Sequence, residues 1–149
     1  MVVHYTFNDG FTNNICDWRT ISNIKTSGWQ ESKSYDGECL TLTAINGWRC
    51  FMWDIGSNNV GSPITFSFEY KITDTSNAGY IYVQNMSSVG YGGALLTLDL
   101  NTTDWTKATV NISSATQYIG FNIRGVDQTG LNLTMQVKNI KIALNDFDD

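Results

Sequence analysis

The sequence predicts an all-β fold, a β-sandwich of two antiparallel sheets, and three observations support this prediction. Aromatic residues make up 13% of the chain, charged residues only 15%, and there is one proline. Abundant Asn, Thr and Ser, with few Lys and Glu, are typical of strands joined by polar turns. Short runs of alternating polar and apolar residues recur between turn signals, and no stretch shows a 3.6-residue amphipathic period.

The alternating runs place the strands. We expect them at about 3–7, 21–25, 28–32, 39–45, 48–54, 63–73, 79–85, 93–98, 105–113, 117–124 and 133–144. Turn residues separate them, with a hairpin turn expected at Asn46-Gly47. In the run 64–72, Phe66, Phe68 and their alternate neighbours face the core. In the last run the parity slips by one residue at Lys138-Asn139, which indicates a β-bulge.

The length and the charge limit the possible functions. A chain of 149 residues is expected to form one domain, over 1–144, and the acidic residues 145–149 to form a tail or the start of a linker. The net charge is −5, the pI is near 4.6, and the nine Lys and Arg residues do not cluster along the sequence. This excludes nucleic acid and an anionic membrane as partners and disfavours a strongly anionic polysaccharide.

The cysteines and the chain start bear on the cellular compartment. Cys16, Cys39 and Cys50 are odd in number and form no CxxC pair, so we expect buried free thiols rather than zinc ligands. The first residues show no charged-then-apolar pattern, so we expect no signal peptide, and no apolar run is long enough to span a membrane. We expect an extracellular location, as a module of a larger secreted enzyme or on the surface of a virion.

The most informative run is 79–85, because its two faces differ in chemistry. Ile81 and Val83 point to one side as core residues, and Tyr80, Tyr82 and Gln84 point to the other. A pyranose has an apolar C–H face that stacks on a flat ring and a rim of hydroxyl groups that need hydrogen-bond partners. Rings beside amide groups therefore predict a sugar-binding face.

Other runs offer groups that suit the same face. Asn122 and Arg124 point away from the core in one run, and Glu69 does so in another. If the sheets curve, these side chains share one concave face with the tyrosines. The run 48–53 is apolar on both sides, so its orientation stays open. One orientation turns Arg49 and Trp53 outward, and the other turns out Trp48.

The order of these landmarks resembles the β-jelly-roll carbohydrate-binding modules of families 4, 9 and 22, which are attached to bacterial glycoside hydrolases. Some phage tail proteins look similar too. The matching pieces cover almost the whole chain: Phe7-Asn8-Asp9-Gly10, Trp29, 36–42, 64–72, 103–107 and 137–142. The resemblance implies a jelly roll that binds a neutral polysaccharide or oligosaccharide without catalysis. It implies binding on the concave sheet or in the edge loops, through Trp48 or Trp53, Tyr80 or Tyr82, and Asn122 with Arg124.

The resemblance also raises the question of a structural calcium ion. Family members hold it between the N-terminal segment and the last strand with an Asp where this chain has Lys138. Asp9, Asp36 and Asn139 remain possible oxygen ligands.

Two other classes of function fit the sequence less well. A small β-sandwich glycosidase or lyase needs a pair of facing carboxylates, and Glu31, Glu38 and Glu69 are the only glutamates, with His4 the only histidine. We therefore expect no enzyme. A phage tail or capsid-type assembly domain without a sugar site is expected to show a large apolar outer patch instead of Tyr, Gln, Asn and Arg.

Overall fold

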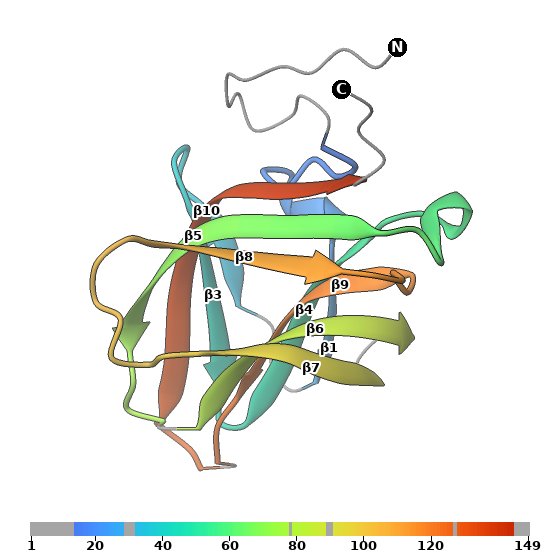
Figure 1. The fold of residues 1–149 in the computed structure, drawn as a ribbon. Helices are drawn as coiled ribbons and strands as arrows, with labels where there is room; N and C mark the ends of the chain where they lie inside the picture. The colour runs from blue at the N-terminus through green and yellow to red at the C-terminus, as the bar shows by residue number, and fades with distance from the viewer. Residues whose placement is uncertain (1–13, 29–31, 78, 89–90, 127, 145–149) are drawn as a thin grey trace.

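The chain folds into a sandwich of two five-stranded antiparallel sheets, which confirms the predicted fold class. The computed structural model describes residues 14–28, 32–77, 79–88, 91–126 and 128–144. Figure 1 shows the two layers, with β10, β5 and β8 in one and β4, β9, β6 and β7 in the other. Within these described ranges, no helix is long and apolar enough to span a membrane.

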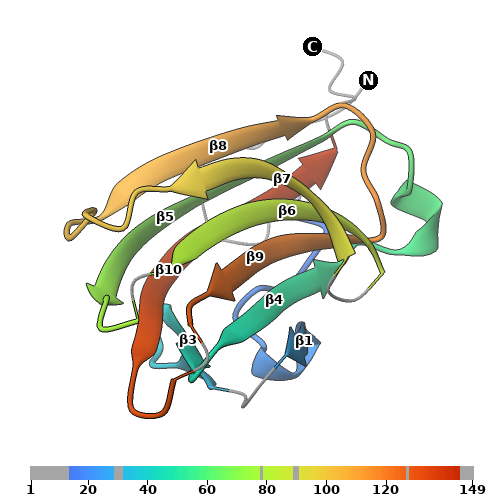
Figure 2. The same cartoon turned by 90° about the horizontal axis from the view of Figure 1, so that it is seen from below.

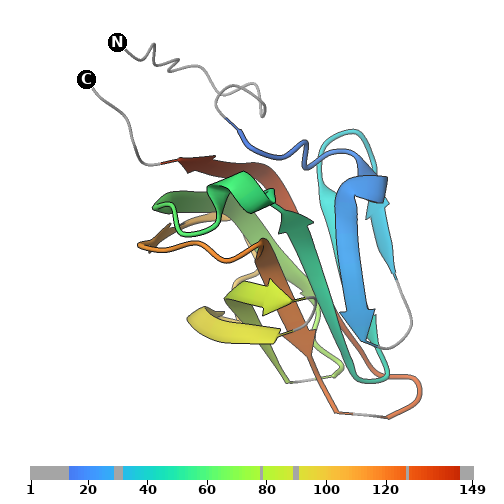
Figure 3. The same cartoon turned by 90° about the vertical axis from the view of Figure 1, so that its right-hand side faces the viewer.

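Each sheet is defined by its strand order. Sheet A runs β1 (Ile24–Gly28), β4 (Trp48–Asp54), β9 (Tyr118–Arg124), β6 (Tyr80–Ser88) and β7 (Tyr91–Leu98). Sheet B runs β2 (Lys33–Tyr35), β3 (Leu40–Ile45), β10 (Asn132–Leu144), β5 (Ile64–Asp74) and β8 (Thr106–Ile112). Two 3-10 turns, η1 (Ile21–Asn23) and η2 (Ser57–Asn59), complete the elements. Figures 2 and 3 show that the edge strands β7 and β8 lie on one side of the sandwich and β1 on the opposite side.

The strand predictions hold from residue 39 onward and are weaker before it. The run 48–54 coincides with β4, and the later runs agree with β5 to β10 within a few residues. The run 21–25 was wrong in its first half, because 21–23 form η1 and the strand begins at Ile24. Most of the expected strand 28–32 lies outside the described residues; of its two ends, Gly28 closes β1 and Ser32 precedes β2. The expected strand 3–7 lies outside the described residues.

The core forms where the inner faces of the two sheets meet. Its centre is aromatic: Phe121 of sheet A packs edge-on against Phe68 of sheet B, with ring centroids 4.9 Å apart. Phe66 lies 5.5 Å and Trp53 lies 6.1 Å from the same Phe121 ring. Ring pairs at these separations contribute about 0.5–1.5 kcal/mol each beyond their buried area. The sandwich thus holds sheet A rigidly by its inner face and leaves the outer face available.

The link at Asn46-Gly47 is a crossing between sheets and not the expected hairpin. It joins β3 of sheet B to β4 of sheet A. Asn46 has φ 59° and Gly47 has φ 154°, so the Asn residue takes the left-handed conformation that a tight turn requires. The Asn-Gly pair therefore does form a turn, as predicted. The flanking strands β3 and β4 do not pair with each other, because tertiary contacts decide which strands become neighbours.

The predicted bulge in β10 is confirmed. Lys138 pairs with Glu69 and Lys141 pairs with Ser67, so β10 carries one extra residue at this point. Asn139 takes a left-handed φ of 53°, and its Nδ2 donates a hydrogen bond to Glu69 Oε2. The bulge lets Val137 and Ile140 both face the core despite their odd spacing.

Candidate functional site

The outer face of sheet A, which points away from sheet B, brings most of the predicted binding residues together. The register places Trp48, Arg124 and Tyr80 in one row across β4, β9 and β6. The next row holds Cys50, Asn122 and Tyr82. A third row holds Met52, Gly120 and Gln84. Because neighbouring strands lie about 4.8 Å apart, each row spans about 10 Å from β4 to β6.

Tyr80 and Tyr82 form a stacked aromatic pair on β6. They are alternate residues of one strand, so both point to the outer face. Their ring centroids are 4.2 Å apart with an angle of 27° between the ring planes. Both side chains are half-buried. The pair is therefore fixed by its own stacking and still offers ring surface to solvent.

Trp48 and Arg124 supply a second aromatic and polar unit in the same row. The Arg124 guanidinium carbon lies 5.9 Å from the Trp48 ring centroid, within cation–π range. Arg124 is exposed and lies between Trp48 and Tyr80 in the register. Its guanidinium thus stands between aromatic side chains on both neighbouring strands, where it can donate to a bound hydroxyl group.

The floor of this face is apolar and densely packed. Cys50, Met52 and Met86 are fully buried there, with Trp48 and Tyr118 packed against them. Burial raises the pKa of the Cys50 thiol to about 11, with the cations of Arg124 and Arg49 acting in the opposite direction. The thiol therefore stays neutral and acts as a small apolar group.

Two amide side chains lie in this apolar setting without full hydrogen bonding. Gln84 and Asn122 are each only 7% exposed. Gln84 Oε1 and Asn122 Oδ1 are buried, and neither accepts a hydrogen bond within the part of the chain that the structure describes. A buried acceptor without a donor costs about 1–3 kcal/mol. Asn122 lies directly opposite Tyr82, and Gln84 follows Tyr82 by two residues on β6. Both unsatisfied oxygens therefore belong to residues next to the stacked tyrosines.

The structure corrects three predicted site residues. Trp53 is fully buried in the core, because β4 turns Trp48, Cys50 and Met52 outward instead. Arg49 also points inward at 7% exposure, and its guanidinium donates to the Gly28 carbonyl at 3.1 Å. Glu69 lies on the other sheet. The expectation that these three side chains line the sugar-binding face is therefore wrong.

The possible calcium ligands do not assemble a site among the described residues. Asp36 Oδ1 accepts from the backbone N–H groups of Cys39 and Glu38 at 2.9 and 2.8 Å, which lowers the pKa of its carboxyl. Asn139 is engaged with Glu69, and Asp9 lies outside the described residues. In the described ranges, no group of three or more His, Cys, Asp or Glu side chains is placed to hold a metal ion. Because Asp9 lies outside the described residues, the structure does not test the calcium site, which stays a prediction.

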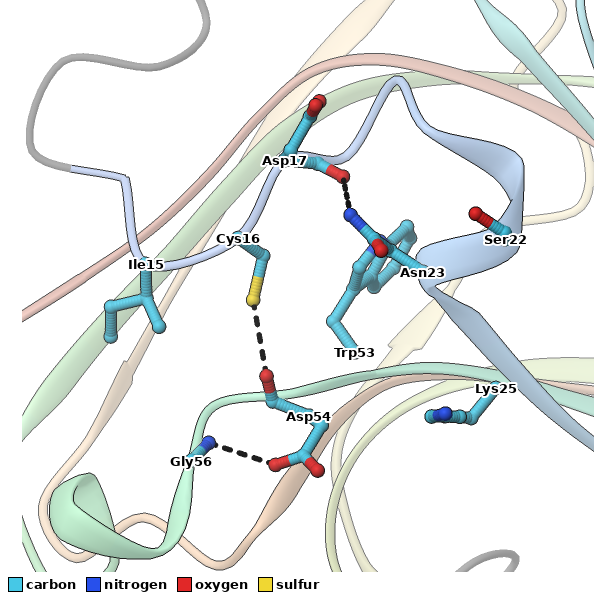
Figure 4. A pocket seen from close by; sticks show the side chains of 9 residues that line it. All are labelled: Ile15, Cys16, Asp17, Ser22, Asn23, Lys25, Trp53, Asp54 and Gly56. Atoms are coloured by element: carbon cyan, nitrogen blue, oxygen red, sulfur yellow. Dashed lines mark hydrogen bonds between the residues drawn. The ribbon is translucent and has the colours of Figure 1, made fainter.

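A cavity of about 400 Å³ lies at the β1 edge of sheet A (Figure 4). Cys16 Sγ donates to the Asp54 carbonyl at 3.6 Å, and Asn23 Nδ2 donates to the Asp17 carbonyl at 3.2 Å. Burial and the Asp54 charge raise the pKa of Cys16 to about 12. Trp53 offers no ring surface here because it is fully buried. The lining is Ile15, Cys16, Asp17, Ser22, Asn23, Lys25, Trp53, Asp54 and Gly56.

Sequence reasoning missed the contribution of Gly120. A Cβ at Gly120 would lie 2.0 Å from the Phe51 carbonyl oxygen, so β9 approaches β4 closely at this row. The missing side chain leaves the outer face open between Met52 and Gln84. A glycine inside an alternating run is a known sign of close backbone approach, and this signal was present in the sequence.

No protein-family model matches the sequence, and no curated protein matches it. Solved structures do match. The K3 adhesin domain of Lys-gingipain from Porphyromonas gingivalis is 16% identical, with a TM-score of 0.59 over 88% of this chain and 96% of that one. A family 29 carbohydrate-binding module variant, complexed with mannohexaose, is 14% identical, with a TM-score of 0.54 over 85% and 87%.

A family 4 carbohydrate-binding module is 16% identical, with a TM-score of 0.51 over 82% of this chain and 78% of that module. Identities this low establish a common fold and leave open what this chain binds. The chain has the jelly-roll β-sandwich fold that is shared by carbohydrate-binding modules and an adhesin domain.

Proposed function

We propose that the chain binds a neutral polysaccharide, without catalysis, on the outer face of sheet A. One observation carries this proposal. Gln84 Oε1 and Asn122 Oδ1 are buried acceptors without donors, next to the stacked rings of Tyr80 and Tyr82. Hydroxyl groups of a sugar that stacks on these rings are the donors that the two oxygens lack.

The expected affinity follows from these groups. Two stacking contacts contribute about 0.5–1.5 kcal/mol each, and a few hydrogen bonds add about 1 kcal/mol each. The sum of roughly 4–7 kcal/mol corresponds to a dissociation constant between about 1 mM and about 10 μM. Because Gln84 Oε1 and Asn122 Oδ1 are buried in the free protein, neighbouring side chains must move before a sugar reaches them, and this movement reduces the binding free energy.

The charges of this face support a neutral ligand and a non-catalytic role. Lys25 and Arg124 are its cations, and Asp54 is the one carboxylate among its described side chains. Asp54 Oδ1 accepts from Gly56 N at 2.8 Å, and its Oδ2 accepts from Gln117 at 3.2 Å. Glycoside hydrolysis needs two carboxyl groups about 5–9 Å apart across the ligand. The described residues of this face do not supply them.

The binding role suits a module that attaches a larger exported protein or a virion to a glycan surface. The similar carbohydrate-binding modules and the similar adhesin domain support an extracellular setting of this kind. Mannohexaose is the ligand of the family 29 variant. A β-mannan is therefore the first polymer to test, followed by glucans, xylans and bacterial wall polysaccharides.

The test is native affinity electrophoresis against this panel with matched variants. Tyr82→Ala removes one stacking ring, and Thr73→Ala changes an exposed residue of sheet B as a control. We expect one polymer to retard the wild type and Thr73→Ala equally and to release Tyr82→Ala. Retardation that survives in Tyr82→Ala contradicts binding on this face.

An assembly or adhesion domain without a sugar site is the second candidate, because the Lys-gingipain adhesin domain has the same fold. It predicts no retardation by any polymer in the panel. The apolar residues Leu95 and Leu96, exposed by 39% and 37% on edge strand β7, favour this candidate as a possible contact area.

A further inference from the structure

The outer face of sheet B, which points away from sheet A, gathers a large share of the positive charge. Four lysines lie there on the neighbouring strands β5, β8 and β10: Lys71, Lys107, Lys138 and Lys141. Glu69 and Asp74 are the carboxylates among the outward described residues of these three strands. Four of the nine basic residues thus share a face with two of the fourteen acidic residues.

This distribution differs from what the sequence suggested. The basic residues look scattered along the chain and the net charge is −5. The outward residues of β5, β8 and β10 nevertheless carry +2 in sum, so the rest of the chain carries −7. The negative net charge of the chain therefore does not describe the electrostatic potential at this face.

The register shows how close the charges are. Lys107, Glu69 and Lys138 form one row across β8, β5 and β10. Two strand spacings separate the Lys107 and Lys138 backbones by about 10 Å. An anionic group that binds midway between them is about 5 Å from each, which is shorter than the Debye length of about 8 Å at physiological ionic strength, so both charges act on it.

Trp105 fixes the position of two of these lysines. It precedes Thr106, which pairs with Tyr70, and this places Trp105 beside Lys71. The Lys71 Nζ lies 4.9 Å and the Lys138 Nζ lies 4.2 Å from the Trp105 ring centroid. The two ammonium groups are therefore no more than about 9 Å apart. A neutral ring orients the two ammonium groups without neutralising them, and the Glu69 carboxylate lies opposite Lys138 in the register.

The carboxylates around these lysines accept local hydrogen bonds. Asp36, in the turn between β2 and β3, accepts from the backbone N–H groups of Cys39 and Glu38, and Asp74 accepts from the backbone N–H of Ser76. Glu69, inside the face, accepts a hydrogen bond from Asn139. These carboxylates are thus committed to local hydrogen bonds.

We propose that the outer face of sheet B is a second binding surface, for a polysaccharide that carries regularly spaced anionic groups. The carboxylates, sulfates or phosphates of such a polymer bind the ammonium groups of Lys71 and Lys138, and Lys107 extends the contact along the sheet. This surface is on the opposite side of the sandwich from the proposed neutral-sugar face, so the two ligands bind independently.

The experiment measures binding of the whole chain to two anionic probes, polygalacturonate and a phosphate-bearing wall teichoic acid, by affinity electrophoresis at low and at physiological salt. The two probes separate a carboxylate source from a phosphate source. We expect retardation by at least one probe that weakens as salt rises. The double variant Lys71→Gln/Lys138→Gln is expected to lose about tenfold in affinity.

Matched variants make the outcome specific. Lys25→Gln removes an exposed lysine from sheet A and is expected to bind normally. Glu69→Gln removes the opposing charge and is expected to bind about twofold to fivefold more tightly. Tyr82→Ala is expected to leave anionic binding unchanged, which separates this surface from the proposed neutral-sugar face. Circular dichroism checks that each variant is folded.

Two results overturn the proposal. One is no retardation of the folded wild type by either probe at low salt. The other is an equal loss of binding in Lys25→Gln and in the Lys71→Gln/Lys138→Gln double variant, because that result reports total charge and not a surface on sheet B.

Discussion

Replacing Asn122 by leucine is expected to stabilise the fold and abolish sugar binding. Asn122 is 7% exposed, and its Oδ1 is buried without a hydrogen-bond donor among the described residues. Its cross-strand neighbour on β4 is the fully buried Cys50. A leucine of similar size removes the unpaired acceptor and adds apolar contacts with this floor.

The size of the effect follows from the cost of the unpaired oxygen. Removing the unpaired oxygen raises the free energy of unfolding by about 1–3 kcal/mol. Imperfect packing of the branched leucine side chain reduces this gain. We expect the free energy of unfolding to rise by about 1–2 kcal/mol. For a chain of 149 residues this raises Tm by about 2–8 °C.

Asn85 is the matched control because its amide is fully engaged. Its Oδ1 accepts from Thr116 N and Thr116 Oγ1 at 2.7 and 2.6 Å, and its Nδ2 donates to the Ser114 carbonyl at 3.1 Å. Asn85→Leu leaves these partners without their bonds and is expected to destabilise the fold by about 2–4 kcal/mol. The same chemical change thus has opposite signs at two positions.

The assay is urea unfolding followed by tryptophan fluorescence, with affinity electrophoresis on the polymer that retards the wild type. We expect Asn122→Leu to unfold at higher urea and to lose retardation. If Asn122→Leu is destabilised as much as Asn85→Leu, the Asn122 oxygen has a partner in solution, and the observation that carries the proposed function fails.

Three further predictions concern the fold that supports this face. Trp53→Ala is expected to destabilise the protein by about 3–5 kcal/mol, since the side chain is fully buried; a stable variant that only loses binding contradicts its core position. Gly120→Ala is expected to cost about 1–3 kcal/mol because its Cβ meets the Phe51 carbonyl oxygen at 2.0 Å, and Gly93→Ala, with open space around it, is expected to be nearly neutral in thermal unfolding. Because the pKa of the Cys16 thiol is about 12 in the fold, this thiol stabilises the fold fully below its unfolded pKa of about 8.5. Above about pH 8.5 its contribution falls by about 1.4 kcal/mol per pH unit, and in pH-dependent urea unfolding Cys16→Ala is expected to reduce the slope by that amount while the Cys50 contribution remains.

The sequence was sufficient where a strand has one polar and one apolar side. The alternation of Ile81 and Val83 with Tyr80 and Tyr82 fixed which side chains point outward, and the register confirms it. The parity slip at Asn139 likewise predicted the bulge. In such strands burial alone decides the orientation, so local pattern and tertiary structure agree.

The sequence was insufficient where both sides of a strand are buried. In β4, Phe51 and Trp53 fill the core while Cys50 and Met52 form the floor of the outer face, so hydrophobicity carries no information on orientation. The pattern therefore leaves Trp48 and Trp53 as alternatives for the binding face, and the structure excludes Trp53 because it is fully buried.

Pairing between distant strands also lay beyond the sequence. Glu69 had the right parity for an outer face, but β5 belongs to sheet B and not to the sheet of the tyrosines. The gathering of four lysines on that sheet has the same origin, since the register of β5 with β8 and β10 brings residues 71, 107, 138 and 141 together. Patterns within one strand cannot reveal which strands become neighbours.

The most direct test of the central claim is chemical-shift mapping by NMR with an oligosaccharide of the polymer that retards the wild type. We predict that the shifted resonances are the backbone amides of 80–86 and 118–124 and the Trp48 indole N–H, which belong to the outer face of sheet A. Shifts confined to sheet B, or to the cavity around Cys16 and Asn23, would contradict sugar binding on this face.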